Sequence, residues 1–311
     1  MSRKDLSALL LLALVWGASF LFMRIASPVF GPVVTTGLRV AIAAGALLLY
    51  AALTRSPIGL RKRWKPFLLL GGLNAALPFS LICAAELHLS ASLAAILNAT
   101  TPIFAALAAW GTGGERPGLT KAAGLVLGLV GVGILVGWSP EPMDKTMLYS
   151  VLFSLGAALA YGFGGLYAAR VGKGVPPLTL AIGQQLGATV WLLPLVAVFP
   201  PPERPTMAAA LSVLCLSLVC TAFAYLLYFR LIASVGAVKT VSVTFLVPVF
   251  GLVWGVIFLH EPVYLNTVAG LAIILLSIVL IGGRVRKAVE QKGTSARHLA
   301  KAESEMRSYK N

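Results

Sequence analysis

Long hydrophobic runs, separated by short polar segments, organise almost the whole chain. Each run has roughly 20 residues, the length that a helix needs to cross the hydrocarbon core of a bilayer. The pattern predicts ten membrane-spanning helices, at about 6–26, 33–54, 66–87, 91–113, 119–138, 147–169, 177–199, 207–229, 236–259 and 264–283. The connecting segments are too short and too few to supply the polar shell of a soluble helical protein. We therefore expect an all-α polytopic membrane protein.

Composition agrees with this expectation. Of the 311 residues, 59% are hydrophobic and 11% are charged, whereas a soluble domain has about 25% charged residues. The first run is too long for a cleaved signal peptide and is followed at once by a second run, so we expect it to stay in the protein. Cys83, Cys215 and Cys220 lie in hydrophobic runs without metal-ligand spacing, and we interpret them as core-filling residues.

The net charge of +15 predicts membrane topology and not a nucleic-acid partner. If the N-terminus is cytoplasmic, 21 of the 25 lysines and arginines fall in cytoplasmic segments, and only Arg24, Lys145 and Arg204 fall in external ones. Such an excess of basic residues is typical of the cytoplasmic side. We expect a multi-pass protein of the cell inner (plasma) membrane with both termini in the cytoplasm.

The two halves of the chain share a pattern of prolines, glycines and acidic residues. A shift of 146 positions superposes identical residues: Pro102 on Pro248, Glu115 on Glu261, Leu119 on Leu265, Ala123 on Ala269 and Gly124 on Gly270. A shift of 145 places Gly17 on Gly162 and Trp16 on Tyr161. We expect two five-helix copies, at 1–140 and 145–284, and a basic cytoplasmic tail at 285–311. Because five spans is an odd number, the second copy must be inverted, as in many secondary transporters.

Several motifs occur in order along the chain: VWGASFLFMRIA at 15–26, GLRVAIAA at 37–44, ASLAAILNATTPIFAALAAW at 91–110, GERPGLTKAAGLVLGLVGVGIL at 114–135 and HEPVYLNTVAGLAIILLSIVL at 260–280. Together they resemble the EamA branch of the drug/metabolite transporter superfamily, and within it the bacterial exporters of aromatic and other neutral amino acids. The resemblance implies ten helices in two inverted five-helix repeats around a central cavity. It also implies that the first four helices of each repeat line the cavity and that the fifth and tenth are peripheral.

One arginine is expected well inside a span. Arg39 lies in the second run, where a charge is costly and therefore suggests function. It would pair with a substrate carboxylate, or alternatively bond to backbone carbonyls or Glu86 and hold its helix. The second half has Gln184 and Gln185 at the equivalent place. Adjacent helical positions point about 100° apart, so we expect one of them to face the cavity; the alternative is a bond between helices.

Prolines and aromatic residues complete the candidate site. Pro78, Pro102 and Pro248 are expected to bend the third, fourth and ninth spans and to free carbonyl groups there. Besides Arg39 and the two glutamines, the candidate substrate-binding residues are polar residues beside these bends and deep aromatic residues; packing remains the alternative for each. They are Asn98, Thr101 and Thr244, with Trp16, Phe20, Phe79, Tyr161, Tyr225 and Trp254.

The distribution of acidic residues and histidines argues against several activities. All ten acidic residues fall at span ends, in loops or in the tail, so we do not expect proton antiport through a central carboxylate. Glu86 and His88, at the outer end of the third run, are either a titratable pair or interfacial residues. The scattered histidines and the lack of a phosphate-binding loop predict no metal, no cofactor and no ATP-driven step. We do not expect an enzyme.

Glu115 and Glu261 each precede the last helix of a half. A carboxylate is favourable at the N-terminal end of a helix, so we expect each of them to fix the turn before that helix. A contact with a nearby lysine or arginine that gates the transport path is the alternative.

These observations predict a secondary transporter, an exporter or facilitator, that moves neutral and preferably aromatic or apolar amino acids by alternating access. The expected partners are a small-molecule substrate and the lipid bilayer. Two alternatives stay open: a transporter of another small metabolite (a purine, a sugar or a cysteine-pathway compound), and a membrane receptor or scaffold that transports nothing. The oligomeric state is open, and a monomer is compatible with the sequence.

Overall fold

The computed structural model describes residues 1–60, 63–113, 118–137, 144–240 and 242–281, with residues 237 and 238 described by their backbone alone. These residues form helices and no strands. The helices are α1 (Arg3–Phe30), α2 (Pro32–Leu53), α3 (Trp64–Gly71), η2 (Gly72–Ala76), α4 (Leu77–Ala85), α5 (Ala91–Asn98), α6 (Thr101–Gly111), α7 (Leu119–Gly137), α8 (Lys145–Val171), α9 (Pro177–Val198), α10 (Met207–Leu214), η3 (Cys215–Phe223), α11 (Ala224–Val235), α12 (Ala237–Thr240), α13 (Val243–Leu259) and a last helix, Leu265–Ile281.

The predicted spans are confirmed. Eight helical runs are long and apolar enough to cross a membrane, and two further apolar helices, α13 and Leu265–Ile281, lie at the ninth and tenth predicted positions. The structure differs mainly in length: the first helix continues to Phe30 and the eighth run to Val235. At the N-terminus, Ser2 and Asp5 form a capping box that satisfies the first backbone amides of α1, which explains its early start.

The third span of each half contains a stretch of π-helix. α3, η2 and α4 form one run, as do α10, η3 and α11. A shift of 145 positions places η2 inside η3. A π-helical stretch widens the helix and changes the direction of its side chains, and it occurs often at functional sites.

The prolines affect the backbone in different ways. α5 ends at Asn98 and α6 begins at Thr101, directly before Pro102. Pro78 lies in the first turn of α4, directly after η2, where a missing N–H is tolerated. Pro248 lies inside α13, and the ninth span is instead divided between α12, which ends at Thr240, and α13, which begins at Val243.

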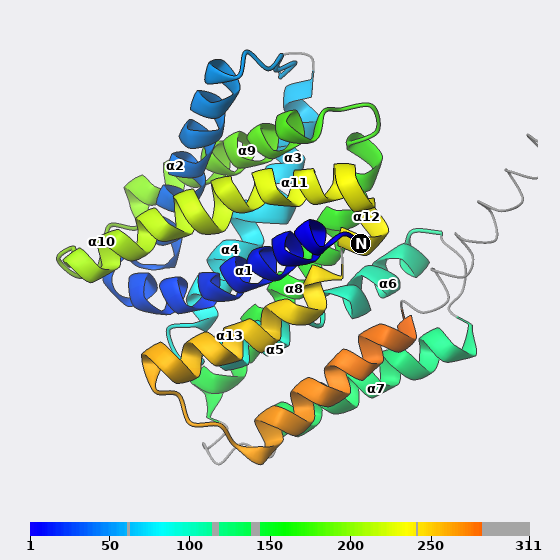
Figure 1. Ribbon diagram of the computed structural model, residues 1–311. Helices are drawn as coiled ribbons and strands as arrows, with labels where there is room; N and C mark the ends of the chain where they lie inside the picture. Colours follow the sequence, from blue (N-terminus) through cyan, green and yellow to red (C-terminus); the bar gives the residue numbers. More distant parts are fainter. Residues whose placement is uncertain (61–62, 114–117, 138–143, 241, 282–311) are drawn as a thin grey trace, which may run out of the picture.

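The helices pack in reciprocal pairs. α1 packs against α13 of the ninth span and against α10, η3 and α11 of the eighth, and Figure 1 shows it between these neighbours. In the same way α8 packs against α5 and α6 of the fourth span and against α4 of the third. α2 and α9 pack against each other, while η3 packs on α2 and η2 packs on α9. Exchange of the two halves therefore reproduces the packing, as expected for an internal repeat.

Two equivalent glycines allow close contacts of α1 with α13 and of α8 with α6. A Cβ atom on Gly17 would meet the backbone of α13 at Phe250 and Gly251, and one on Gly162 would meet the backbone of α6 at Phe104 and Ala105. Helix contacts inside a membrane depend on such small residues. The repeat seen in the sequence thus corresponds to a repeated contact in space.

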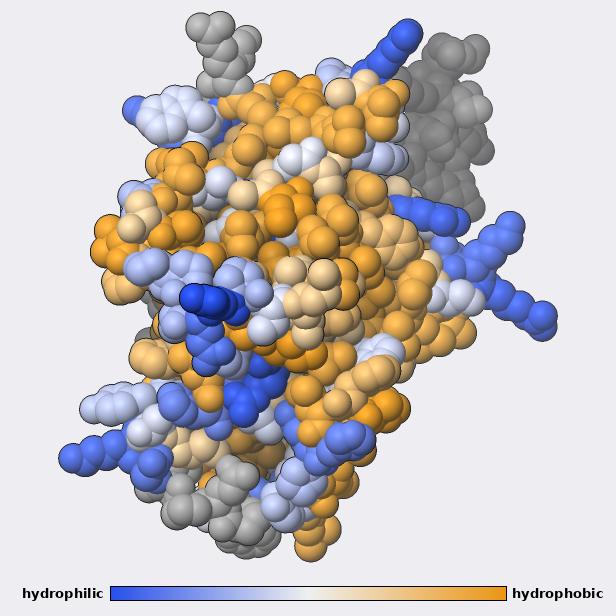
Figure 2. Space-filling model, turned by 90° about the vertical axis from the view of Figure 1, so that its left-hand side faces the viewer, coloured by the Kyte–Doolittle hydropathy of each residue, from blue (hydrophilic) through white to orange (hydrophobic). Residues whose placement is uncertain are grey.

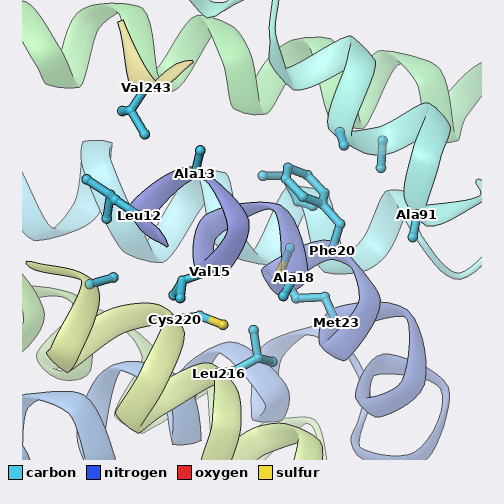
Figure 3. Close-up of a cluster of buried hydrophobic side chains, with 14 of the residues drawn as sticks. Leu12, Ala13, Val15, Ala18, Phe20, Met23, Ala91, Leu216, Cys220 and Val243 are labelled. Carbon is cyan, nitrogen blue, oxygen red and sulfur yellow. The ribbon is translucent and has the colours of Figure 1, made fainter. Parts of the chain in front are cut away.

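The largest core surrounds α1. The residues of this core lie on both sides of α1 in Figure 3: Val243 and Ala91 lie on one side, and Leu216 and Cys220 lie on the other. This core therefore joins α1 of the first half to helices of the second half.

The fifth and tenth spans lie together at the edge of the molecule (Figure 1). Gly124, Gly131 and Gly270 bring α7 and the helix Leu265–Ile281 into close contact. The outer faces of these helices carry exposed hydrophobic residues such as Leu129 and Leu276. Figure 2 shows large hydrophobic areas on the molecular surface, which suit contact with lipid.

Candidate functional site

Arg39 lies in the interior, held by uncharged groups. Its side chain is 4% exposed. Nε donates a hydrogen bond to Thr221 Oγ1 at 3.0 Å, one terminal nitrogen contacts Met23 Sδ at 3.4 Å, and Cζ lies 3.7 Å from the centre of the Phe79 ring. None of these partners carries a negative charge. A guanidinium group offers five N–H donors, so this arrangement leaves donors for an anionic group.

Gln184 occupies the equivalent place in the second half. Its Oε1 accepts a hydrogen bond from Asn74 Nδ2 at 2.8 Å, and its Nε2 donates to the Tyr225 hydroxyl at 2.6 Å. The side chain is 4% exposed. Gln184 thus joins the third span of the first half to the eighth span.

Arg39 and Gln184 make matching contacts across the two halves. A shift of 145 positions relates the two residues. Arg39, on α2, bonds to Thr221 in η3 of the second half, and Gln184, on α9, bonds to Asn74 in η2 of the first half. Each π-helical stretch therefore presents a polar side chain to the opposite half. The polar groups at the centre of the bundle thus follow the two-fold symmetry of the helix packing. The charge does not follow it, because Arg39 is charged and Gln184 is neutral.

Gln185, the next residue on α9, does not take part in these hydrogen bonds. It is fully buried, and neither polar atom of its side chain has a hydrogen-bond partner among the residues that the structure describes. A buried amide without partners costs about 1–3 kcal/mol. Of the two adjacent glutamines, Gln184 is the one that forms hydrogen bonds between helices, which was the alternative to facing the cavity.

Aromatic rings flank Arg39 and Gln184. Phe79 and Tyr161 meet edge to face with ring centres 6.2 Å apart, and Trp16 meets Tyr225 in the same way at 6.5 Å. Trp16, Tyr161 and Tyr225 are each only partly buried, although all three lie among packed helices. We define Arg39, Thr221, Gln184, Asn74 and these four aromatic residues as the central site.

Two residues of the central site, Asn74 and Thr221, and one residue beside it, Tyr228, were not among the substrate-binding candidates taken from the sequence. Tyr228, three positions after Tyr225 and therefore on the same side of α11, lies 5.5 Å from Trp16 between ring centres; helical spacing would have identified it. Asn74 and Thr221 owe their positions to the π-helical stretches η2 and η3. The hydrophobic pattern of the sequence does not predict those stretches.

Other candidates lie in different surroundings. Phe20 is 3% exposed and belongs to the core around α1, as Figure 3 shows. Trp254 donates its indole N–H to the Leu14 carbonyl at 3.0 Å and packs against Phe258, so it joins α13 to α1. Both residues connect helices of opposite halves.

The remaining polar candidates lie near the breaks in the fourth and ninth spans. Thr101 Oγ1 donates to the Asn98 carbonyl at 2.8 Å, while Asn98 Oδ1 has no partner among the described residues. Thr244 is partly buried in the first turn of α13. The Thr101 hydroxyl thus stabilises the backbone at the break in the fourth span.

A second polar cluster lies at the end of the bundle that carries residues 86–92 and 260–264. Glu261 accepts hydrogen bonds from the backbone amides of Ala91 at 2.6 Å and Ser92 at 3.0 Å, and from the Ser92 hydroxyl. It therefore caps α5, where a carboxylate meets the positive end of a helix. The expectation that Glu261 acts on the helix after it was wrong, because the folded chain brings α5 closer. Glu115 lies outside the described residues.

Glu86, directly after α4, belongs to the same cluster. Its side chain is fully buried and neither carboxylate oxygen has a hydrogen-bond partner among the described residues. Arg24 of α1 donates to the backbone carbonyl of Glu86. Burial raises the pKa of the Glu86 carboxyl well above its ordinary value; the charge of Arg24 opposes this rise and that of Glu261 adds to it. We call Arg24, Glu86, Ser92 and Glu261 the outer cluster.

Metal ligation finds no support in the described part of the chain, where no group of three or more histidine, cysteine, aspartate or glutamate side chains is placed to hold an ion.

Comparison with known proteins agrees with the fold and the repeat. The chain is 30% identical over 287 residues to an uncharacterized transporter of Bacillus subtilis, YvbV, covering 89% of this chain and 92% of that protein. It is 25% identical over 312 residues to a probable amino-acid metabolite efflux pump of Escherichia coli, covering 93% and 99% of the two chains. One solved crystal structure, 18% identical, covers 93% of this chain and 99% of its own, with a TM-score of 0.64.

The profile of the EamA-like transporter family matches residues 4–137 and matches again at residues 148–283. The two matches cover nearly all of the helical part of the chain. The protein is thus a multi-pass membrane protein, and it belongs to the EamA-like transporter family.

Proposed function

We propose that the protein is a secondary transporter that carries neutral amino acids with apolar or aromatic side chains across the membrane by alternating access. The observation that carries this proposal is the position of Arg39, buried at the centre of the bundle and bonded only to uncharged partners. A carboxylate group would supply the missing opposite charge, and the planar guanidinium suits such a group.

The rest of the central site fits the other parts of an amino acid. Gln184 and Tyr225 offer oxygen acceptors to an ammonium group, and the ring faces of Phe79 and Tyr161 attract cations as well as apolar groups. Trp16 offers a further apolar surface beside Tyr225. The relatives named as amino-acid metabolite efflux pumps support this class of substrate.

The other candidates have supporting roles in this proposal. Phe20 and Trp254 hold the interface between the halves, and Asn98, Thr101, Thr244 and Gln185 offer polar groups to substrate in another state of the cycle. The fourth span would change direction at Pro102 and the third beside Pro78, whereas Pro248 lies within the continuous helix α13.

Two inverted repeats, residues 1–140 and 145–284, would supply the movement. The reciprocal packing of helices around α1 and α8 supports this division. If the halves exchange conformations, the central site opens first to one side and then to the other. The chain contains no phosphate-binding loop, so the substrate gradient is the proposed source of energy.

Orientation in the inner membrane is part of the same proposal, with both termini and the tail 285–311 in the cytoplasm. Lys145 and Ser234 are both exposed and lie at opposite ends of helices. In a chain without native cysteines, Lys145→Cys is expected to react with a membrane-impermeant maleimide on intact cells, whereas Ser234→Cys should react only after lysis. The opposite result would reverse the proposed orientation.

Uptake into liposomes tests the function. Purified protein in liposomes should accelerate the entry of labelled phenylalanine or leucine relative to protein-free liposomes, and an imposed proton gradient is not required for entry. Labelled purines and sugars serve as the test of the alternative substrates. Entry of one of these in place of any neutral amino acid would refute the proposed substrate, and entry of no solute would favour a receptor or scaffold.

A further inference from the structure

The outer cluster contains an ionisable group that the central site does not use. Glu86 is fully buried, and both of its carboxylate oxygens lack hydrogen-bond partners among the described residues. An ionised carboxylate in such surroundings is strongly destabilised, whereas a protonated carboxyl loses much less on burial. The packing at this end therefore favours the protonated form of Glu86.

Charged groups around Glu86 come from several elements. α1 contributes Arg24, whose side chain bonds to the backbone carbonyl of Glu86 and leaves the carboxylate free, and α2 contributes Arg39 from a deeper position. The segment before the last helix contributes the Glu261 carboxylate. The two arginines favour ionisation of Glu86, while Glu261 and burial oppose it, burial being the largest effect.

Other titratable groups lie near by. Cys83 is one turn before Glu86 on α4 and is fully buried. α8, which packs against α4, carries Tyr161 beside Phe79 and the exposed Lys145 at its start. His88 and His260 are exposed at the same end of the bundle. Any pH response assigned to Glu86 must therefore be separated from that of the two histidines.

The contact that Glu261 makes beside Glu86 joins parts of the chain that alternating access would separate. Glu261 holds the segment after α13 to the start of α5 through two backbone amides and the Ser92 hydroxyl. Gly255 makes room for this contact, because a Cβ atom there would collide with both Glu261 and Ser92. Separation of α13 from α5 would break these bonds.

We propose that Glu86 is a proton-binding site of the transport cycle: it holds a proton while the outer cluster is closed as in this structure, and releases it to water when the cluster opens. The inference rests on the proposed function in one respect, since it assumes that the cluster opens during transport. Acidic pH then favours the closed state of the outer cluster. The stabilisation that the bound proton gives to the closed state is lost as the pH rises through the pKa that Glu86 has in that state.

Spin-label distances test this proposal without measuring transport. Labels are attached at His88→Cys and Val263→Cys, two exposed positions that follow Glu86 and Glu261 by two residues each, in a chain whose three native cysteines are alanine. At acidic pH we expect one short distance, and at alkaline pH an additional longer distance. Glu86→Gln, which resembles the protonated carboxyl in shape and charge, should keep the short distance at every pH, whereas Glu86→Asp should keep the pH response.

Controls separate Glu86 from its neighbours. The label at position 88 removes His88, and His260→Gln added to the labelled chain should leave the response unchanged. Infrared spectra give a second readout: the C=O stretching band of a protonated carboxyl should disappear on raising the pH and be missing in Glu86→Gln. The proposal is overturned if the distances do not change with pH, or if Glu86→Gln responds like the parent. A normal response with no amino-acid uptake would instead contradict only the proposed function.

Discussion

Replacement of Arg39 by glutamine is expected to reduce kcat/KM for neutral amino acids by roughly 10- to 150-fold, because a hydrogen bond to a charged group contributes about 1.5–3 kcal/mol. The glutamine keeps a donor for Thr221 but lacks the charge that the substrate carboxylate requires. Arg39→Lys keeps the charge but not the planar pair of donors, so its activity should lie between those of the parent and Arg39→Gln. Initial uptake rates in liposomes over a range of substrate concentrations measure the effect.

A substrate without a carboxylate provides the matched control. Phenethylamine retains the aromatic ring and the ammonium group of phenylalanine. The parent should prefer phenylalanine, as measured by competition with labelled leucine, and Arg39→Gln should lose most of that preference. If the variant discriminates between the two compounds as well as the parent does, Arg39 does not bind the carboxylate.

Replacement of Gly187 by alanine is expected to destabilise the protein by about 1–3 kcal/mol, the usual cost of forcing an extra group into a packed contact. Gly187 lies where α9 crosses α3, and an added Cβ atom would be 3.0 Å from Leu68 Cα and closer still to the Phe67 carbonyl. These are backbone atoms, so the helices themselves must separate. Thermal unfolding in detergent, followed by loss of the monodisperse peak in size-exclusion chromatography, measures the change.

Gly165→Ala is the control for this substitution. Gly165 lies within α8, and a Cβ atom there would have no neighbour within 4 Å. Alanine should be neutral or should stabilise the helix by about 0.5–1 kcal/mol. Equal unfolding temperatures for the two variants would show that the α3–α9 contact is looser than the structure indicates.

The spans could be predicted from the sequence because hydrophobic length is set by the bilayer and not by the details of packing. The repeat could also be found, since Gly17 and Gly162 occupy equivalent positions and each allows a close contact with a helix of the other half. Arg39 was recognisable because a charge inside a hydrophobic run has few structural explanations.

The partners of these residues could not be predicted. Thr221 reaches Arg39 from a π-helical stretch, whose altered side-chain directions do not follow from the spacing of an ordinary helix. The periodicity of a helix predicts that the side chains of Gln184 and Gln185 face different directions. Only the structure shows that Gln184 forms hydrogen bonds with both Asn74 and Tyr225. Glu261 was assigned to the nearest helix in sequence, whereas the nearest helix N-terminus in space is that of α5.

Exchange in liposomes tests whether the central site binds neutral amino acids and is exposed alternately to the two sides of the membrane. The measurement is the uptake assay with one addition: liposomes are preloaded with unlabelled phenylalanine or with buffer. We expect labelled phenylalanine to enter faster into preloaded liposomes, and Arg39→Gln to abolish most of this acceleration. Entry that is no faster than in protein-free liposomes, whatever the internal solution, would show that the protein does not carry neutral amino acids by alternating access.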